Sequence, residues 1–361
     1  MESHYILFAI PFFFLLIGVE LLYSWVKKKK YYRFNDAITN LNIGIGNQLM
    51  NLFFKAAIAA IYIYMYNNFA LFYQEATVWS FILCFLAFDF LFYWAHRWSH
   101  EINFLWGAHV VHHSSEEYNL AVALRQPWFH NIIAFYIFLP LPFLGFDPVI
   151  FLSAAAFHTL YQFWIHTKAI GKFPKVIEYV FSTPSHHRVH HGVNPKYLDK
   201  NHGGVLIIWD RIFGTFKEEE EAPVYGITKP LKSWNAAWAN FHYYVDMFIA
   251  ARKMSKWTDK VKMIFARPGW LPDELGGYQA PQEINEDTYK LFDTKTSTWL
   301  NYYVLVQFIL ITLGTVAFMY HFETISTFYK LVFLIVLILS LMICGAIFEN
   351  KKWLIYSKLT I

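Results

Sequence analysis

Histidines gather in two short windows of this sequence. Ten of the 16 histidines lie within residues 96–113 or 186–202. His96 and His100 are four residues apart, a spacing that places two imidazoles on one face of a helix, about 5–6 Å apart at Cβ. That separation suits two ligands of one metal ion. The chemistry that these residues could perform is therefore metal binding by imidazole.

The pattern His-x-x-His-His occurs twice, once in each window. Its members are His109, His112 and His113 in the first copy, and His187, His190 and His191 in the second. In a helix, positions i, i+3 and i+4 share a face. His186 precedes the second copy, and His158 and His166 lie between the windows. The alternative, that all are ordinary core histidines, would bury many imidazoles without partners at a high cost for each nitrogen.

The number and type of these ligands bear on the metal. The two cysteines lie elsewhere, in separate apolar runs, which argues against a structural zinc site. Eight or more imidazoles are too many for one ion, so two ions are expected, and haem would use only axial histidines. Imidazole suits iron, zinc, copper and nickel alike. Iron is preferred because a nitrogen-rich pair of iron ions in a membrane is suited to activating O₂ against C–H bonds.

Charged residues accompany the histidines. Glu101 follows His100 directly, and it is either a residue that orients or binds at the metal centre or an ordinary interfacial glutamate. Asp89 lies two helical turns before His96, within an apolar run, and an intramembrane carboxylate is expected to have a partner. Arg97 or a histidine is the partner that we expect. Three further residues fit structural ion pairs equally well: Arg125, Arg188 and Asp210.

An apolar scaffold must position these side chains. Of the 361 residues, 57% are hydrophobic and 16% are charged, against about a quarter charged in soluble domains. A disordered chain is excluded, and the net charge of +4, without a basic stripe, gives no sign of nucleic-acid binding. A helix crosses the hydrocarbon core with about 20 apolar residues. Candidate spans are 5–26, a weaker one at 42–66, 76–95, 299–320 and 327–348, together with a proline-broken helical hairpin at 131–165.

Basic residues in short loops indicate the orientation. The lysines at 27–30 follow the first apolar run, which favours a retained anchor over a cleaved signal peptide. The 67–75 loop carries no basic residue, whereas the last pair of runs ends in two lysines at 351–352. We therefore predict an all-α polytopic membrane protein with seven crossings, or five and a re-entrant hairpin. Its N-terminus is outside, and its histidine clusters face the cytoplasm.

Four regions follow from these patterns. Residues 1–75 are expected to form N-terminal spans, 76–225 a histidine-rich di-metal oxygenase core, 226–298 an extension of a cytoplasmic helical cap, and 299–361 a C-terminal pair of spans.

The three histidine motifs, in this order, resemble those of the fatty acid hydroxylase / sterol desaturase superfamily of membrane di-iron oxygenases. The resemblance covers about residues 40–225. Within the superfamily the chain is most similar to the alkylglycerol monooxygenase group, through three stretches and the final apolar pair beyond 299. The stretches are His96-Arg-Trp-Ser-His100-Glu101, Thr183-Pro-Ser-His-His-Arg-Val-His-His-Gly192 and Trp209-Asp-Arg-Ile-Phe-Gly-Thr-Phe216. His202 departs from that group, in which an aromatic residue is expected.

The resemblance implies a di-iron site. Its implied ligands are His96, His100, His109, His112, His113, His187, His190 and His191, with His166 and His186 as neighbours or additional ligands. Glu101 is implied to matter for activity. The implied reaction inserts one atom of O₂ at the ether-linked carbon of an alkylglycerol in the bilayer, and the hemiacetal collapses to a fatty aldehyde and a glycerol derivative. Tetrahydrobiopterin is the implied reductant.

Two alternatives stay open. A sterol or fatty-acyl hydroxylase or desaturase would use the same di-iron site and take electrons from a donor protein. A membrane metal-binding protein or transporter is of another class, but transporters place ionisable residues near the midplane, whereas these clusters lie at span ends. The composition, rich in Lys, Asn, Ile and Phe, suggests a bacterial inner membrane.

Overall fold

Helices form the whole regular part of the fold. The computed structural model describes residues 2–284 and 289–351. Over these ranges it contains fifteen α-helices, two 3₁₀ helices and no strand. Two isolated β-bridges join Phe181 to Leu206 and Gly192 to Tyr225. The all-α prediction is therefore confirmed.

Six longer helices carry most of the apolar sequence. They are α1 (Glu2–Val26), α2 (Phe34–Phe69), α3 (Val78–Glu101), α8 (Pro148–Trp164), α14 (Thr298–Tyr320) and α15 (Thr327–Phe348). Four of them, α2, α3, α14 and α15, are long and apolar enough to cross a membrane, and α1 contributes a shorter apolar stretch, Ile10–Val26. Each predicted span thus falls on a helix, which fits a membrane protein. The count of seven crossings and the sidedness stay predictions.

The expected hairpin at 131–165 is a broken arm followed by a continuous one. The broken arm contains α6 (His130–Ala134), η1 (Phe135–Phe138) and α7 (Pro140–Phe143), and α8 is the continuous arm. Gly145 turns the chain between them with φ +78°, where a Cβ would lie 1.8 Å from the carbonyl oxygen of Phe72. This contact requires glycine. The tip of the hairpin therefore reaches the loop that joins α2 to α3.

Local signals explain where the long helices begin. Thr77 and Ser80 form a capping box at the start of α3, and Asp147 caps α8 directly before Pro148. Ser297 accepts a hydrogen bond from the backbone N–H of Leu300 at the start of α14. Such caps satisfy N–H groups that a helix leaves unpaired at its first turn.

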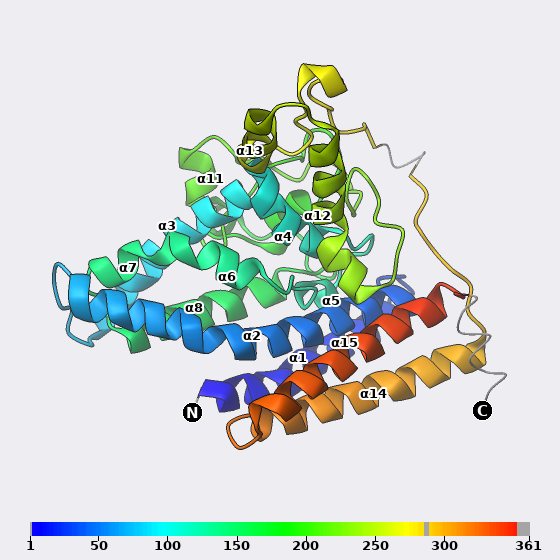
Figure 1. Ribbon diagram of the computed structural model, residues 1–361, viewed down its shortest axis with the longest axis horizontal. Helices are drawn as coiled ribbons and strands as arrows, with labels where there is room; N and C mark the ends of the chain where they lie inside the picture. The colour runs from blue at the N-terminus through cyan, green and yellow to red at the C-terminus, as the bar shows by residue number, and fades with distance from the viewer. Residues whose placement is uncertain (1, 285–288, 352–361) are drawn as a thin grey trace.

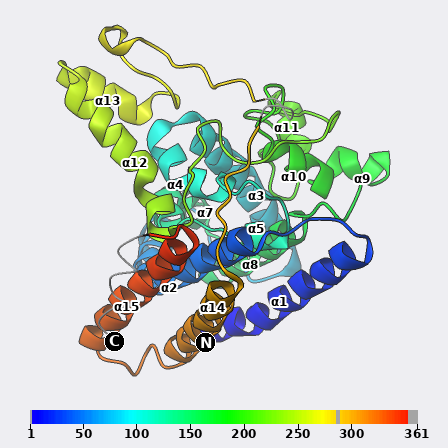
Figure 2. The same ribbon diagram turned by 90° about the vertical axis from the view of Figure 1, so that its right-hand side faces the viewer.

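The apolar helices form a layer beneath the histidine motifs (Figures 1 and 2). Helices α1, α2, α14 and α15 run beside one another. Helices α3 and α8 pack against each other, and α8 also contacts α2. One apolar core joins α2, α12, α14 and α15, and a second joins α2, α3 and α8. Helix α2 belongs to both cores, so it connects the C-terminal pair to the hairpin.

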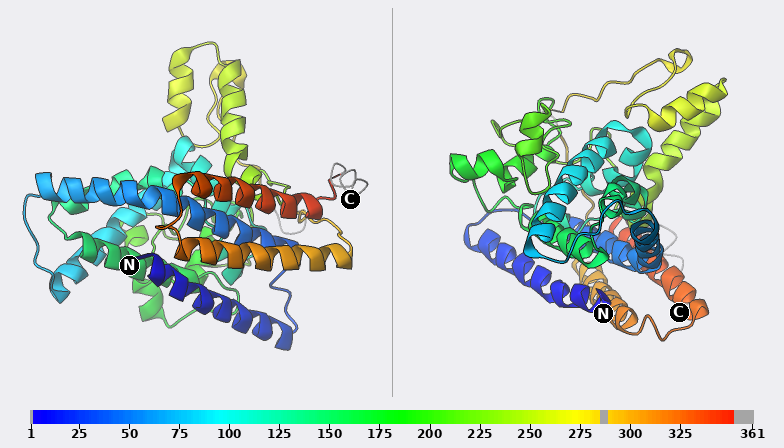
Figure 3. Two further views of the ribbon diagram at one scale, coloured as in Figure 1. Left: turned by 60° about the horizontal axis from the view of Figure 1, so that its bottom comes forward. Right: turned by 90° about the vertical axis from the view of Figure 1, so that its left-hand side faces the viewer.

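The remaining helices carry and cover the histidine motifs. They are α4 (Asn103–His113), α5 (Leu120–Ala123), α9 (Lys175–Val180), α10 (Pro184–His190), α11 (Ile208–Ile212), α12 (Ala236–Lys253), α13 (Trp257–Phe265) and η2 (Asp273–Leu275). Helix α12 packs on α4 and α15, and its outer part projects from the body with α13 (Figure 3). A Cβ on Gly107 of α4 would lie 2.7 Å from the Tyr244 ring, so glycine allows α12 this close to the histidine-bearing helix.

Candidate metal centre

Helices α3 and α4 meet at a break that turns the first three histidines toward one another. The backbone of Ile102 is extended, so α3 ends at Glu101 and α4 begins at Asn103. Asn103 holds the break in place. Its backbone N–H donates to the carbonyl of Ala266, and its side chain donates to the carbonyl of Met263 on α13. His100 at the end of α3 consequently lies 5.0 Å, between ring centroids, from His109 on α4.

Helix α10 supplies the second motif from the opposite side. Thr183 precedes it with extended backbone and Pro184 occupies its first turn, the position at which proline costs no hydrogen bond. The rings of His190 and His191 then reach the first motif, with His191 at 4.3 Å from His113 between centroids. Two windows that are 73 residues apart at their nearest ends therefore form one buried cluster.

Nine histidines form two groups that could each hold a metal ion. Within each group, one ring nitrogen per residue lies within 4.8 Å of the others, and every member is buried. We call the first the five-histidine group; it contains His96, His100, His109, His113 and His190. We call the second the four-histidine group; it contains His112, His166, His187 and His191.

Each His-x-x-His-His motif serves both groups. His109 and His113, four residues apart, enter the five-histidine group, whereas His112 enters the four-histidine group. In the second motif the i, i+4 pair enters the four-histidine group, and His190 crosses to the other. The two motifs therefore interlock, because consecutive histidines on a helix point in directions about 100° apart. This arrangement places the groups side by side.

The hydrogen bonds of two rings show that their facing nitrogens are bare. His112 Nδ1 lies 3.1 Å from the carbonyl oxygen of Arg125, and His166 Nδ1 lies 2.7 Å from that of Gln162. A carbonyl only accepts, so each Nδ1 carries the proton. The two Nε2 atoms, 3.2 Å apart, then face each other with lone pairs. A cation between them would resolve this repulsion.

A proton is disfavoured as that cation. Burial lowers the pKa of His166 to about 4. Burial, followed by the neighbouring His166, lowers the pKa of His112 well below its usual value. Both rings are therefore neutral at pH 7, the form in which imidazole binds metal. The residues present fit a metal ion.

The separations of the facing nitrogens also indicate the coordination geometry. His109 Nε2 lies 3.1 Å from the Nε2 atoms of both His96 and His113, and His187 Nε2 lies 2.9 Å from that of His166. Two nitrogens bound at about 2.1 Å to one ion are about 3.0 Å apart at a right angle and about 3.4 Å apart at a tetrahedral angle. The observed values favour right angles, as in octahedral coordination, over a tetrahedral structural zinc site.

One loop orients the five-histidine group from outside. The carbonyl of Lys200 lies 2.9 Å from His190 Nδ1, and the carbonyl of His202 lies 2.8 Å from His96 Nδ1. Asp199 places a carboxylate oxygen 3.5 Å from His100 Nδ1. Partners of this kind fix the tautomer and the direction of a metal-binding imidazole. We call residues 199–203 the cradle loop.

Buried Asp210 holds the cradle loop in place. Its two carboxylate oxygens accept hydrogen bonds of 2.7 Å from the backbone N–H groups of His202 and Gly203, and Thr215 donates to it at 2.6 Å. Within the loop, Asp199 and Asn201 have φ values of +54° and +57°, a conformation that needs such support in residues other than glycine.

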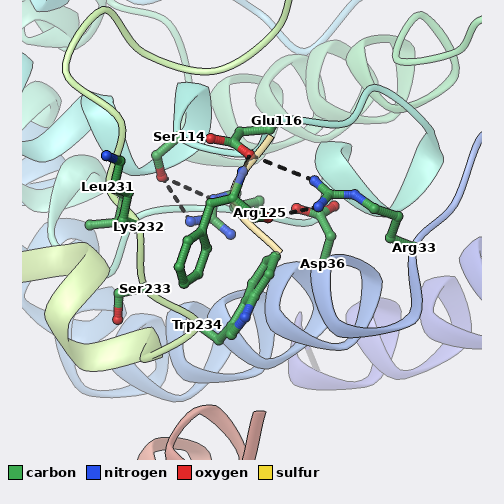
Figure 4. A pocket seen from close by; sticks show the side chains of 10 residues that line it. Arg33, Asp36, Ser114, Glu116, Arg125, Leu231, Lys232, Ser233 and Trp234 are labelled. Carbon is green, nitrogen blue, oxygen red and sulfur yellow. Dashed lines mark hydrogen bonds and ion pairs between the residues drawn. The ribbon is translucent and has the colours of Figure 1, made fainter. Parts of the chain in front are cut away.

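Arg125 supports the four-histidine group from below. Its carbonyl orients His112, and its guanidinium donates to the carbonyl of Val111, to Ser114 and to Asn40 on α2. Burial lowers the pKa of Arg125 to about 10, so it is still charged at pH 7. Figure 4 shows its contact with Ser114. Arg125 thus ties α2 to α4 directly behind a candidate ligand.

Two of the predicted site residues lie outside both groups. His186 Nδ1 accepts from the backbone N–H of Thr183, and its Nε2 lies 3.0 Å from Glu178, so neither nitrogen is free for a metal ion. Glu101 accepts a hydrogen bond of 3.0 Å from Arg97 and does not reach the clusters. The geometry therefore does not support the expected metal role of His186, and it places the Glu101 carboxylate in an ion pair.

The partner of Asp89 is a histidine outside the candidate ligands, as one of the two expectations had it. His158 Nε2 lies 2.8 Å from the Asp89 carboxylate, which also accepts from the backbone N–H of Val205 and from the indole of Trp209. Asp89 therefore ties α3 to α8 and to the segment after the cradle loop. Arg188 forms a bidentate ion pair with Glu219, the structural alternative considered for it.

Sequence reasoning missed three residues beside the centre. Asp199 and Asn201 belong to the cradle loop, and His130 lies 3.2 Å from Ser99 with its ring 5.2 Å from that of His109. No spacing pattern connects these residues to the motifs, although a polar Asp-Lys-Asn run eight residues after His191 is a weak signal for the loop.

Comparisons with known proteins agree with this geometry. A family model described as fatty acid hydroxylase matches residues 81–215. An alkylglycerol monooxygenase of Xenopus tropicalis is 36% identical over 349 residues, which cover 95% of this chain and 77% of the relative. Those of Homo sapiens and Danio rerio are 40% and 38% identical, over 85% and 84% of this chain and 69% and 68% of theirs. No solved structure matches.

Proposed function

Because the chain belongs to the alkylglycerol monooxygenase family, we propose that it hydroxylates the ether-linked carbon of an alkylglycerol with O₂. One oxygen atom enters the C–H bond, and two electrons and two protons reduce the other to water. The resulting hemiacetal breaks its C–O bond and releases a fatty aldehyde and a glycerol derivative. The convergence of nine buried histidines in two adjacent groups is the observation that carries this proposal.

In this proposal the nine histidines hold two iron ions. Bound iron supplies the activation of O₂, which side chains alone do not perform. The proposed ligand set includes His166 and excludes His186 and Glu101. His186 pairs with Glu178, and Glu101 pairs with Arg97. Backbone carbonyls orient four of the nine: His96, His112, His166 and His190.

Aromatic rings shield the centre on two sides. Trp106 lies 5.0 Å from His100 and 5.7 Å from His113, between ring centroids. Tyr118 lies 5.3 Å from His191 on the other side, and its hydroxyl donates to the carbonyl of Ile165. These rings exclude water from the reacting atoms, which strengthens electrostatic interactions inside and limits side reactions.

The setting suits a lipid substrate that stays in the bilayer. Residues 76–225 form the oxygenase core in this proposal, between N-terminal spans at 1–75 and the C-terminal pair at 299–361, with 226–298 extending the cap. The basic residues at 27–30 and 351–352 support a cytoplasmic active face. Tetrahydrobiopterin is the proposed reductant. A bacterial inner membrane is the proposed compartment, on composition alone.

Isotope labelling tests the reaction. Purified protein in lipid nanodiscs is incubated with an alkylglycerol, tetrahydrobiopterin and ¹⁸O₂, and the aldehyde is reduced with borohydride before its oxygen exchanges with water. The fatty alcohol should carry one ¹⁸O atom, because the inserted oxygen stays with the alkyl carbon while the ether oxygen leaves with glycerol. Protein without bound iron, and without O₂ consumption with any reductant, would contradict the proposal.

A fatty-acyl or sterol hydroxylase or desaturase is the second candidate. The match of residues 81–215 to the fatty acid hydroxylase model favours it, because that match covers the histidine motifs shared by both functions. Lipid analysis of cells with and without the gene separates the two. Loss of ether lipids supports the first candidate, whereas new hydroxy acids, desaturated acyl chains or oxygenated sterols, dependent on an electron-donor protein, support the second.

A further inference from the structure

His202 is a buried histidine with unsatisfied ring nitrogens. It lies in the cradle loop, is fully buried, and neither Nδ1 nor Nε2 has a hydrogen-bond partner among the described residues. The backbone of Asp199 approaches the ring as a hydrogen-bond acceptor, but too poorly placed to form a full hydrogen bond with either nitrogen. A buried polar group without a partner destabilises the fold. The position therefore calls for a partner that protein atoms do not provide.

A second histidine outside the two groups shows the contrast. His158 is equally buried, but its Nε2 lies 2.8 Å from Asp89 and its Nδ1 accepts from Gln162 at 2.7 Å. Its surroundings account for both nitrogens. His202 differs because its neighbours are the histidines of the five-histidine group.

The His202 ring lies against three members of that group. Its centroid is 5.0 Å from that of His100 and 5.6 Å from those of His96 and His190. Rings within the group are separated by similar distances, such as 5.4 Å between His96 and His100 and 4.9 Å between His100 and His190. His202 therefore lies at the edge of the group, outside the set of nitrogens that are all within 4.8 Å of one another.

We propose that His202 is a sixth imidazole ligand of the metal ion in the five-histidine group. The proposal rests on the proposed function only in taking that group to hold a metal ion. Right-angled nitrogen separations fit octahedral coordination, and five histidines leave one of its six positions open. A metal ion drawing on a lone pair of His202 supplies the missing partner.

The backbone of His202 is fixed beside the five-histidine group. Its N–H donates to Asp210 and its carbonyl lies 2.8 Å from His96 Nδ1, so the residue contacts the group through its main chain as well. On the next segment, a Cβ on Gly204 would lie 2.4 Å from the His158 ring. This close packing fixes the end of the cradle loop against the pair formed by His158 and Asp89.

The proposal makes the two metal positions chemically different. Six imidazoles saturate an octahedral ion, whereas four leave open positions, and open positions are where catalytic metals bind substrates. The four-histidine group would then be the one that admits an exogenous ligand.

Cobalt binding tests this assignment without relying on activity. Full-length protein in detergent is stripped of metal and titrated with Co²⁺, and the visible absorption and the bound metal per chain are measured. His202→Leu should weaken one of two Co²⁺ sites by about tenfold or more and should raise absorption per cobalt, because cobalt absorbs more strongly at lower coordination number. His242→Leu, a half-buried histidine on α12, is the matched control and should bind as wild type.

Imidazole rescue excludes a merely structural effect. In His202→Gly, added imidazole should restore the wild-type spectrum and the affinity, because the free ligand enters the space left by the ring. Unchanged affinity and spectrum in His202→Leu, or a loss that imidazole does not reverse, would overturn the assignment. Wild-type protein that binds no Co²⁺ would instead contradict the metal centre of the proposed function itself.

Discussion

The five-histidine and four-histidine groups draw on the same two sequence motifs, but different parts of the fold hold them in place. The cradle loop orients three rings of the five-histidine group through Lys200, His202 and Asp199. In the four-histidine group, the carbonyls of Arg125 and Gln162 orient two rings. The five-histidine group thus depends on the cradle loop, which Asp210 holds in place. The four-histidine group depends on the backbone of Arg125, after α4, and of Gln162 on α8.

Two copies of the same sequence motif therefore contribute to two sites that differ in their number of ligands and in their surroundings. The five-histidine group is surrounded by imidazoles and can be closed by His202, whereas the four-histidine group has fewer ligands. The supports are also separate, since Asp210 and Arg125 share no hydrogen-bond partner among the described residues. Changes in each support should therefore affect one group before the other.

Removing a member of the four-histidine group has the largest expected effect. His112→Ala deletes a ring whose Nε2 faces that of His166. We expect aldehyde formation to fall by more than about 100-fold, since even outer partners of metal ligands cost 10–100-fold, and bound iron to fall from two toward one per chain. Iron analysis and turnover of the purified variant check this. Full activity in His112→Ala would remove this residue from the ligand set.

Arg125→Met should disturb the four-histidine group and the fold together. The change leaves the carbonyl of Val111, Ser114 and Asn40 without their buried donor, at a cost of about 1–3 kcal/mol in unfolding free energy for each group left unpaired. Thermal denaturation measures the loss, and metal analysis should show that the ion in the four-histidine group is lost first. Lys229→Met, at an exposed ion pair, is the control. A stable variant with both ions would contradict this support.

Asp210→Asn should act on the five-histidine group alone. One carboxylate oxygen becomes an amide donor, which cannot accept from a backbone N–H, so one end of the cradle loop is released. We expect about tenfold weaker binding of one ion, within the range for partners of metal ligands. Competition titration with a chelator measures the two affinities separately. Equal weakening of both ions would show that the two supports are not independent.

His186→Ala has the smallest expected effect on the centre. It removes the pair with Glu178, so we expect two bound ions, activity within about threefold of wild type, and a stability loss of about 1–2 kcal/mol. Burial opposes ionisation of Glu178, but hydrogen bonds from His186, Ser185 and Phe173 lower its pKa to about 2. Loss of metal in this variant would return His186 to the ligand set.

The sign of this pKa shift gives the pH dependence of the same variant. A carboxyl group with a lowered pKa stabilises the fold fully above its ordinary value of 4.5 and loses this contribution as the pH falls through about 2. The difference in stability between wild type and His186→Ala should therefore be constant near neutral pH and shrink below about pH 4.5. A denaturation series across this range measures it.

Much of the scaffold could be predicted because hydrophobic runs and caps are local features. The runs at 76–95, 299–320 and 327–348 coincide with α3, α14 and α15. The weak run at 42–66 is part of a longer helix, since Asn47 donates to the carbonyl of Pro127 and is therefore buried against protein rather than in a break. Polar residues in an apolar helix mark protein contacts, which hydropathy alone does not distinguish.

The ligand set was predictable only as a list of candidates. Spacing gathered the motif histidines into clusters, and the family resemblance implied eight ligands, with His166 and His186 as neighbours or additional ligands. In three dimensions His166 turns toward His112 and His187, whereas His186 caps α10 and pairs with Glu178. The position of His166 depends on segments distant in sequence, which no local pattern indicates. The partners of His186 precede it closely in the chain, but only the fold turns its ring toward Glu178.

Residue types and their spacing indicated the chemistry available to this protein, which is metal binding by imidazoles with no cysteine in the histidine motifs. They also predicted membrane helices from the apolar runs around these motifs. Residue type and spacing are properties of the chain, so they can be read from it. The tertiary structure decided how the histidines divide between two groups, that His166 joins them, and that His202 lies unpaired at the edge of one. These facts depend on how α4, α8, α10 and the cradle loop pack, and packing is set by contacts between residues far apart in the chain.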